Sequence, residues 1–370
     1  MKIKRNGSLT AAAAAVAGML ALAACGSNSN GSPAASGSAS SSAKIACQSG
    51  SIKASGSTAQ KNAMTTWVNA FQSACPGATI NYQASGSGAG IQDFINNITA
   101  FAGSDSALTP AQTTQASARC GSGNTAINIP MVGGPIAVAY NLSGVSKLIM
   151  TPQVLAGIFA NKITKWNDPA IAAINPGVTL PSATIVSFHR SDSSGTTDNF
   201  TKYLTTAAGS SWTYSHSKVW AAPGGQGAKG SDQVAASIKS TPNSIGYVEY
   251  SFALSGGMSV AQVDNGGGPV TLNTASAAAG IASATVVGTG NDLTLKLDYA
   301  TKSPGAYPIV LVTYEITCYK GLPSSELPLT KAFLTWTSSA GGQGTLAIQG
   351  YAPLPPALIG KVQTVVAGLS

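Results

Sequence analysis

Short apolar segments alternate with amphipathic segments along most of this chain. Residues 184–189 are rich in β-branched and aromatic side chains and predict a buried strand. Beyond them, Phe200, Tyr203 and Leu204 fall on one face of a predicted helix. Because such strands and helices recur in turn, the pattern favours an α/β fold built in layers.

Three turns rich in serine, glycine and threonine each precede a predicted helix. They comprise residues 55–58, residues 84–90 and residues 190–196. After the first turn, a helix is indicated by the apolar residues Met64, Trp67, Val68 and Phe71. The second turn follows the strand-like residues 78–82, and the helix after it is indicated by Ile91, Phe94, Ile95 and Ile98. The first N–H groups of a helix have no partner within it, and the helix dipole favours an anion there. One such turn is typical of an ordinary N-cap, but three of them predict donors that converge on one small anion.

The third of these turns also carries charge. Arg190 supplies a permanent, forked cation that suits phosphate or carboxylate oxygens, and Asp192 is placed to hold that fork. For this turn alone, a serine-rich N-cap beside an arginine is the alternative interpretation. The two other turns favour the anion site.

The first 25 residues have the pattern of an export signal. Three basic residues within the first five precede an Ala/Leu-rich stretch that ends at Cys25. The stretch 22–26, Leu-Ala-Ala-Cys-Gly, resembles the bacterial lipobox, in which the cysteine is lipidated and becomes the mature N-terminus; a plain signal peptide with a chance cysteine is the alternative. Residues 26–43 are almost wholly small and polar, which predicts a flexible tether. No other stretch is apolar enough to span a bilayer, so we expect an exported protein that a lipid on Cys25 anchors to the outer face of the cell membrane.

Charge and metal-ligand content exclude several partners. The formal net charge is +8, and removal of residues 1–24 takes away three basic and no acidic residues, which leaves 17 basic against 12 acidic side chains, or +5. No basic run is interleaved with aromatic residues, so nucleic acid is not an expected partner. The cysteine spacing fits no zinc pattern and only His189 and His216 could assist, so we expect no metal and no cofactor.

Four cysteines follow Cys25, at positions 47, 75, 120 and 318. An even number in an exported chain favours two disulfides, and the sequence alone permits three pairings. We predict the pairs Cys75–Cys120 and Cys47–Cys318.

About 320 residues follow the tether, enough for two lobes with separate cores. Residues 132–140 and 307–314 are strongly apolar and predict strands, the first of which is entered through a flexible pair of glycines. We expect the chain to cross between the lobes at these two strands. The predicted boundaries are 44–131 and 308–370 for lobe 1, and 132–307 for lobe 2.

Several ordered motifs resemble those of the phosphate-binding protein of the bacterial Pst phosphate-uptake ABC transporter, the PstS family. The likeness runs from about Ser55 to the C-terminus and is greatest to the lipoprotein forms of mycobacteria and their relatives. The motifs are Gly56-Ser57-Thr58, residues 86–90, Gly103-Ser104-Asp105, residues 163–169, residues 190–196, Gly246-Tyr247-Val248-Glu249-Tyr250 and Tyr307-Pro308-Ile309. The resemblance implies an α/β, two-lobe periplasmic-binding-protein fold (type 2) with a two-strand hinge and an interlobe ligand cleft.

The resemblance also implies a set of phosphate contacts. Carried over onto this sequence, they are Ser57, Thr58, Ala59, Ser87, Asp105, Arg190, Ser194, Gly195 and Thr196, with Asp192 in a supporting role. Ala59 departs from members that carry a larger residue there, and little is lost because the family contact is a backbone N–H. Asp105 has an arguable role, because an ionised carboxylate only accepts hydrogen bonds. At neutral pH phosphate still carries a proton to donate and sulfate does not, so this residue would select phosphate.

The implied function is the capture of inorganic phosphate and its delivery to the transmembrane permease subunits of an ABC transporter, by a monomer without catalysis. A surface phosphatase or hydrolase is one alternative, but His189 and Arg190 are neighbours on a strand and should point to opposite faces, and no Gly-x-Ser-x-Gly motif occurs. An adhesin-type lipoprotein is the other alternative, and it leaves the three turns unexplained. Four residues that we expect to be exposed are candidates for docking on the permease: Lys165, Trp166, Lys229 and Glu249. For Trp166, packing is the favoured role.

Overall fold

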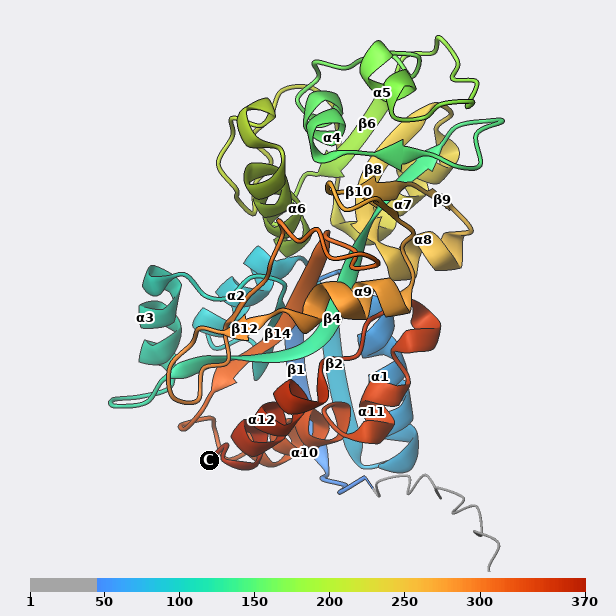
Figure 1. The fold of residues 1–370 in the computed structure, drawn as a ribbon. Helices are drawn as coiled ribbons and strands as arrows, with labels where there is room; N and C mark the ends of the chain where they lie inside the picture. Colours follow the sequence, from blue (N-terminus) through green and yellow to red (C-terminus); the bar gives the residue numbers. More distant parts are fainter. Residues whose placement is uncertain (1–44) are drawn as a thin grey trace, which may run out of the picture. The chain divides into compact units, whose positions relative to one another are not determined.

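The structure is a computed structural model that describes residues 45–370; the predicted lipidation site Cys25 and the predicted tether lie outside these residues. Figure 1 follows the chain through its helices and strands. The helices are α1 (Lys61–Ala74), α2 (Ser87–Ile95), α3 (Pro110–Arg119), α4 (Pro152–Phe159), α5 (Pro169–Ala173), α6 (Gly195–Ala207), η1 (Gly209–Ser211), α7 (Gly230–Ser240), α8 (Tyr250–Gly256), α9 (Thr274–Ala282), α10 (Leu327–Thr337), α11 (Ala340–Gly344), η2 (Ala347–Gln349) and α12 (Pro356–Ala367). The strands are β1 (Gly50–Gly56), β2 (Ala78–Ala84), β3 (Phe101–Ser104), β4 (Ala126–Asn141), β5 (Ile149–Met150), β6 (Val186–Arg190), β7 (Gln226–Ala228), β8 (Ser244–Glu249), β9 (Ser259–Val260), β10 (Gln262–Asp264), β11 (Pro269–Val270), β12 (Thr285–Val286), β13 (Leu295–Lys296) and β14 (Val310–Cys318).

Within residues 45–370, the largest sheet has nine strands in the order β2-β1-β3-β14-β4-β8-β6-β7, with β9 paired to β4. The long strand β4 belongs to both halves of this sheet (Figure 1). Its residues 126–135 pair with β14, and its residues 136–141 pair with β8. We call the half that contains β1, β2, β3 and β14 lobe 1, and the half that contains β6, β7 and β8 lobe 2.

Each lobe contains three parallel strands that are followed by helices. In lobe 1, β1 pairs in parallel with both β2 and β3. In lobe 2, β6 pairs in parallel with both β7 and β8. The carboxyl ends of parallel strands meet at one edge of a sheet, and helices begin there with free N–H groups. The residues that follow β1, β2 and β3, and those that end β6, β7 and β8, are therefore brought together within each lobe.

The predicted helix faces are largely confirmed. Trp67 and Phe71 of α1 are fully buried, as are the three α6 residues Phe200, Tyr203 and Leu204. Phe71 packs edge-on against Phe333 of α10, with 5.5 Å between the ring centroids.

The second predicted helix is shorter than its apolar pattern. Helix α2 ends at Ile95, and Asn97 adopts a left-handed backbone with φ 58°. Ile98 therefore lies beyond the helix and is 52% exposed, so its prediction as part of the apolar stripe was wrong.

The two predicted crossing strands are present with different bounds. Strand β4 begins at Ala126, six residues before the predicted start, and β14 begins at Val310. The glycine pair lies inside β4 and not at its entrance. A Cβ at Gly133 would lie 2.6 Å from the carbonyl oxygen of Ala352, and one at Gly134 would lie 2.6 Å from a methyl group of Leu311. Close packing, and not flexibility, requires glycine here.

The predicted disulfide pairs were wrong, because the structure pairs Cys47 with Cys75 and Cys120 with Cys318. Strand register explains the first pair: Gly50 of β1 lies opposite Ala78 of β2, and each cysteine stands three residues before one of them. The Cα atoms are consequently 5.3 Å apart, within disulfide range.

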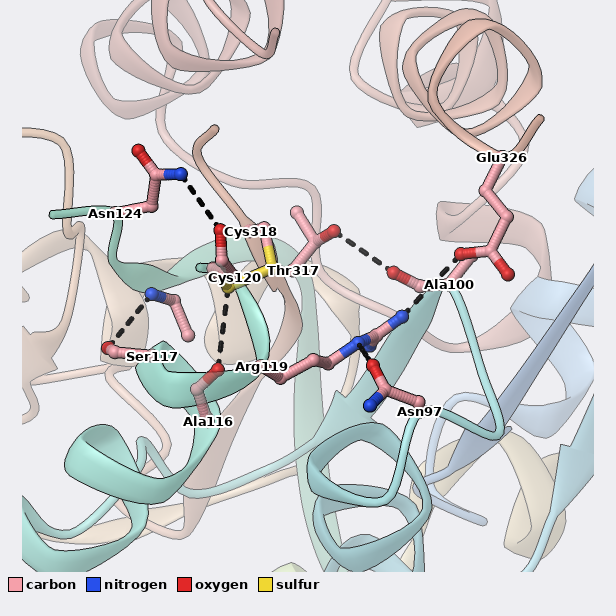
Figure 2. Close-up of a disulfide and its surroundings, with 11 residues drawn as sticks. Asn97, Ala100, Ala116, Ser117, Arg119, Cys120, Asn124, Thr317, Cys318 and Glu326 are labelled. Atoms are coloured by element: carbon pink, nitrogen blue, oxygen red, sulfur yellow. Dashed lines mark hydrogen bonds and ion pairs between the residues drawn. A yellow bond between two sulfur atoms is a disulfide. The ribbon is translucent and has the colours of Figure 1, made fainter. Parts of the chain in front are cut away.

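The second disulfide joins the end of α3 to the end of β14 (Figure 2). Cys318 lies opposite Ala126, the first residue of β4, and α3 leads into that strand. Beside it, Arg119 stacks on the ring of Phe94 and pairs with Glu326 at 3.5 Å.

Two of the four candidate docking residues are buried. Trp166 is fully buried and its indole N–H donates to the carbonyl of Asn243 at 3.0 Å, which confirms the packing role. Glu249 is also fully buried, so its prediction as an exposed residue was wrong. Among residues 45–370, no helix combines the length and the apolar character needed to cross a membrane.

Candidate functional site

The predicted turns of both lobes meet around one buried carboxylate. Asp105 follows β3 and is 3% exposed. Its Oδ1 accepts hydrogen bonds from the hydroxyls of Ser57 at 2.5 Å and Thr313 at 2.8 Å. Its Oδ2 accepts one from Ser87 at 3.1 Å. Burial, reinforced by the nearby charge of Glu249, raises the pKa of Asp105 to about 6, although these hydroxyl donors oppose the rise.

Ser87 links Asp105 to lobe 2. Its Oγ accepts the backbone N–H of Asp105 at 3.1 Å and the N–H of Gly195, the first residue of α6, at 3.2 Å. A Cβ at Gly195 would lie 2.6 Å from both the Asp105 Cβ and the Ser87 Oγ. Only glycine therefore lets the amino end of α6 approach this closely.

Arg190 is the cation of the cluster and is 2% exposed. Its Nε and Nη2 donate to the two carboxylate oxygens of Asp192 at 2.7 and 2.5 Å, which fixes the guanidinium as the sequence predicts. Its Nη1 donates to Thr196 at 3.3 Å and to Ser231 at 3.2 Å. Burial alone lowers the pKa of Arg190, but the hydrogen bonds and charge of Asp192 outweigh it and raise the pKa above its ordinary value.

Strand β8 supplies two further groups that the sequence analysis did not place in the site. The hydroxyl of Tyr247 accepts the backbone N–H of Arg190 at 3.1 Å. The carboxylate of Glu249 accepts the hydroxyl hydrogen of Thr196. Glu249 is the last residue of β8 and belongs to one of the motifs shared with the PstS family, so its position indicated a site residue. Its charge, however, favoured the interpretation that it lies on the surface.

A fourth turn of the same kind contributes Ser231, which the sequence analysis missed. It lies in the first turn of α7, directly after β7, and its hydroxyl lies 2.8 Å from the Thr58 hydroxyl. Its backbone N–H also donates to Thr58 at 3.2 Å. Gly230 and Ser231 repeat the signal of the three recognised turns. Thr313 stands inside a strand, where no local pattern marks it.

All nine predicted contact residues are buried, and two of them, Asp105 and Arg190, are the centres of the hydrogen-bond network. Hydrogen bonds connect six others to these centres: Ser57, Thr58, Ala59, Ser87, Gly195 and Thr196. The N–H of Ala59 donates to the Ser57 hydroxyl at 3.0 Å, within its own turn. Ser194 caps α6 by accepting the N–H of Thr197 at 3.2 Å, and this leaves its own hydroxyl hydrogen to donate elsewhere.

The groups of the cluster suit the binding of a small anion that carries a proton. Hydroxyls, helix N–H groups and one guanidinium supply donors from both lobes, and Asp105 supplies a carboxylate acceptor. Within residues 45–370, no group of three or more His, Cys, Asp or Glu side chains is placed to hold a metal ion.

Strand β14 carries a further buried carboxyl group near Asp105, that of Glu315. Burial raises the pKa of Glu315 to about 8, with the charge of Asp105 adding to the rise and the Gln60 amide opposing it. At neutral pH this side chain is therefore mostly protonated.

We predict that Glu315 makes the protein less stable as the pH rises. The folded state keeps the proton up to about pH 8, whereas the unfolded state releases it near pH 4.5, so the contribution is complete at low pH and is lost as the pH rises through 8. Between pH 5 and pH 9 the free energy of unfolding should fall by up to roughly 4 kcal/mol through this group. Denaturant unfolding at several pH values measures the slope, and Glu315→Gln should flatten it. Equal slopes in the two proteins would contradict the assignment.

Comparisons with known proteins match most of the chain. A family model described as a PBP superfamily domain matches residues 38–340. The phosphate-binding protein PstS3 of Mycobacterium bovis (strain BCG / Pasteur 1173P2) is 46% identical over 371 residues, which cover 99% of each chain. The phosphate-binding protein PstS 2 of Mycobacterium tuberculosis (strain ATCC 25618 / H37Rv) is 41% identical over 376 residues, which cover 100% of each chain.

A solved structure shares the fold. It is a high-affinity periplasmic phosphate-binding protein (PfluDING) bound with phosphate, with a TM-score of 0.71 and 23% identity over 85% of this chain and 93% of that chain. The expected two-lobe periplasmic-binding-protein fold is confirmed by the family match and this likeness.

Proposed function

This chain belongs to the phosphate-binding proteins PstS within the PBP superfamily, and from that premise we propose that the buried cluster around Asp105 and Arg190 binds inorganic phosphate for import by an ABC transporter. The observation that carries the proposal is the meeting of a buried carboxylate of lobe 1, Asp105, with a buried guanidinium of lobe 2, Arg190, among hydroxyl and N–H donors from both lobes. Asp105 accepts hydroxyl hydrogens from Ser57, Thr313 and Ser87.

Each part of the cluster has a task in recognising the ion. Arg190, held by Asp192, supplies a buried positive charge, and a charge-assisted bond is strong in such surroundings. The N–H groups at the start of α2 and α6 supply donors without adding mobile charge. Asp105 accepts the hydrogen of a protonated phosphate oxygen and repels an oxyanion that has none.

Binding would couple to closure of the lobes. Ser57, Ser87 and Asp105 come from lobe 1, and Arg190, Gly195 and Thr196 come from lobe 2, so an ion that contacts both sets favours the closed form. The loaded protein then docks on the permease subunits, which take the ion. We propose that the protein acts as a monomer held at the outer face of the membrane by a lipid on Cys25, so that it stays near its transporter.

A phosphatase is not the activity that we propose. His189 stacks on Trp220 with 4.8 Å between ring centroids, and its Nδ1 lies 2.9 Å from the carbonyl oxygen of Arg190. The ring therefore lies away from the hydroxyls of the cluster, and burial lowers the pKa of His189. His216 lies 2.7 Å from Asp198 and not beside a serine of the cluster. Neither histidine is therefore placed to act as a base for a serine of the cluster.

Equilibrium dialysis with radiolabelled phosphate tests the proposal. The protein is first unfolded and refolded to remove bound ion, and one phosphate per chain should then be retained. Incubation with p-nitrophenyl phosphate should release no p-nitrophenol. Turnover of that ester would favour the phosphatase, and folded protein that retains no phosphate would favour an adhesin.

Selectivity should depend on pH, because the pKa of Asp105 is about 6. Above that pH the ionised carboxylate excludes sulfate, and below it the protonated carboxyl donates a hydrogen bond that sulfate accepts. Between pH 7 and pH 5 the apparent affinity for sulfate should rise roughly tenfold, as the protonated fraction does. Sulfate titrations at the two pH values measure this, and an unchanged affinity would argue against Asp105 as the selecting group.

A further inference from the structure

Two adjacent side chains of α6 reach from lobe 2 onto the segment that carries Asp105. The Nδ2 of Asn199 donates to the Asp105 carbonyl oxygen at 2.7 Å, and Asp198 Oδ2 accepts the hydroxyl hydrogen of Ser106 at 2.6 Å. All four residues are at most 5% exposed. These bonds are made by side chains outside the set assigned to the ion.

Asn199 joins two residues of the site from opposite lobes. Besides Asp105, its Nδ2 donates to the carbonyl oxygen of Gly195 at 2.8 Å, and its Oδ1 accepts the hydroxyl hydrogen of Tyr299 at 2.5 Å. Both N–H groups and the oxygen of the buried amide are thus hydrogen-bonded. The geometry fixes the backbone of Asp105 relative to the first residue of α6.

The carboxylate of Asp198 also has several polar partners. Its Oδ2 also accepts from Lys202 at 2.7 Å, and its Oδ1 lies 2.7 Å from the Nδ1 of His216. A carboxylate fixed by two basic partners offers Ser106 a stationary acceptor, which makes the bond across the lobes directional. We call Ser106, Asp198, Asn199 and Tyr299 the clasp.

The clasp stands between the buried cluster and a cavity. This cavity has a volume of about 660 Å³, and both lobes contribute to its lining. All four clasp residues and Asp105 line it, together with Lys202 and Lys218. The clasp therefore lies where this cavity adjoins the buried cluster.

We propose that Asp198 and Asn199 are positioning residues that keep the lobes closed over the bound ion and thereby set the rate at which phosphate leaves. The proposal rests on the proposed function. Bonds present only in the closed form raise its population, and the apparent affinity falls when that population falls. Loss of the clasp should act on dissociation, because the encounter of the ion with the open form does not involve it.

The test compares Asn199→Ala with Asn141→Ala. Asn141 is a matched control, because its Nδ2 also donates to two backbone carbonyls, those of Ile238 at 3.2 Å and Lys239 at 2.9 Å, but all three residues belong to lobe 2. Dissociation is measured by chasing bound radiolabelled phosphate with unlabelled phosphate, and association by rapid mixing. Ser106→Ala removes one bond of the clasp with little change of volume, and it decides the question if Asn199→Ala does not fold.

We expect Asn199→Ala to release phosphate about tenfold faster and Ser106→Ala about threefold faster, the effect of losing buried hydrogen bonds. Association rates should stay within about twofold of the wild type, and Asn141→Ala should change neither rate. Unchanged release from both clasp variants, equal acceleration in Asn141→Ala, or a loss of affinity that arises from slower association would overturn the role of the clasp. A wild-type protein that binds no phosphate would instead overturn the proposed function, and the clasp's role with it.

Discussion

Arg190→Met should weaken phosphate binding by about a thousandfold, because it removes two or more charge-assisted hydrogen bonds from a buried site. Arg190 is the cation of the cluster, and the substitution leaves the carboxylates of Asp192 and Glu249 near the anion without it. Calorimetric titration of the refolded variant with phosphate measures the loss.

Arg119→Met controls for the cost of removing a buried arginine. The side chain of Arg119 is 3% exposed, and it pairs with Glu326 beside the second disulfide (Figure 2). It also stacks on the ring of Phe94. Both variants should lose stability, but only Arg190→Met should lose affinity. Wild-type affinity in Arg190→Met would remove this residue from the site.

Asp105→Asn should lower the preference for phosphate over sulfate by at least about a hundredfold, since it exchanges a repulsive acceptor for a neutral amide that donates to sulfate. Aspartate and asparagine side chains have the same shape, so the hydroxyls of Ser57, Ser87 and Thr313 keep a hydrogen-bonding partner in a similar position. The ratio of the two dissociation constants, determined in one buffer, reports the change.

Asp232→Asn is the matched control for that change. Asp232 has a half-exposed side chain and pairs with Lys61 at 3.0 Å, away from Asp105. Its removal deletes the same charge from the molecule and should leave the ratio unchanged. If Asp105→Asn discriminated between phosphate and sulfate as the wild type does, the selectivity would have to come from other groups.

The sequence predicted the donor turns because their signal is local. A strand, a run of small residues and an amphipathic helix follow one another at residues 55–58, 84–90 and 190–196, and parallel pairing then places the turns at the strand ends. The turn at Gly230-Ser231 carries the same signal in fewer residues, and it was missed for that reason.

Features that depend on strand register could not be predicted in this way. The disulfides follow from Gly50 lying opposite Ala78 and from Ala126 lying opposite Cys318, and no local pattern states either pairing. Thr313 reaches Asp105 only because β14 lies beside β3.

The burial of charged side chains could not be predicted from the sequence either. Glu249 carries a charge that usually marks a surface, yet it is fully buried because the hydroxyl of Thr196 and the nearby Arg190 provide partners. The clasp was not predicted because polar side chains usually mark a surface. Asp198 and Asn199 follow the recognised turn and have the pattern of the exposed face of its helix.

Calorimetric titration of the refolded wild-type protein with phosphate and then with sulfate at pH 8 tests the central claim most directly. We predict tight binding of one phosphate per chain and no response to sulfate, because the Asp105 carboxylate is ionised at that pH. Equal binding of both ions would contradict the role of Asp105. The absence of heat with either ion, from protein shown to be folded, would contradict phosphate capture itself.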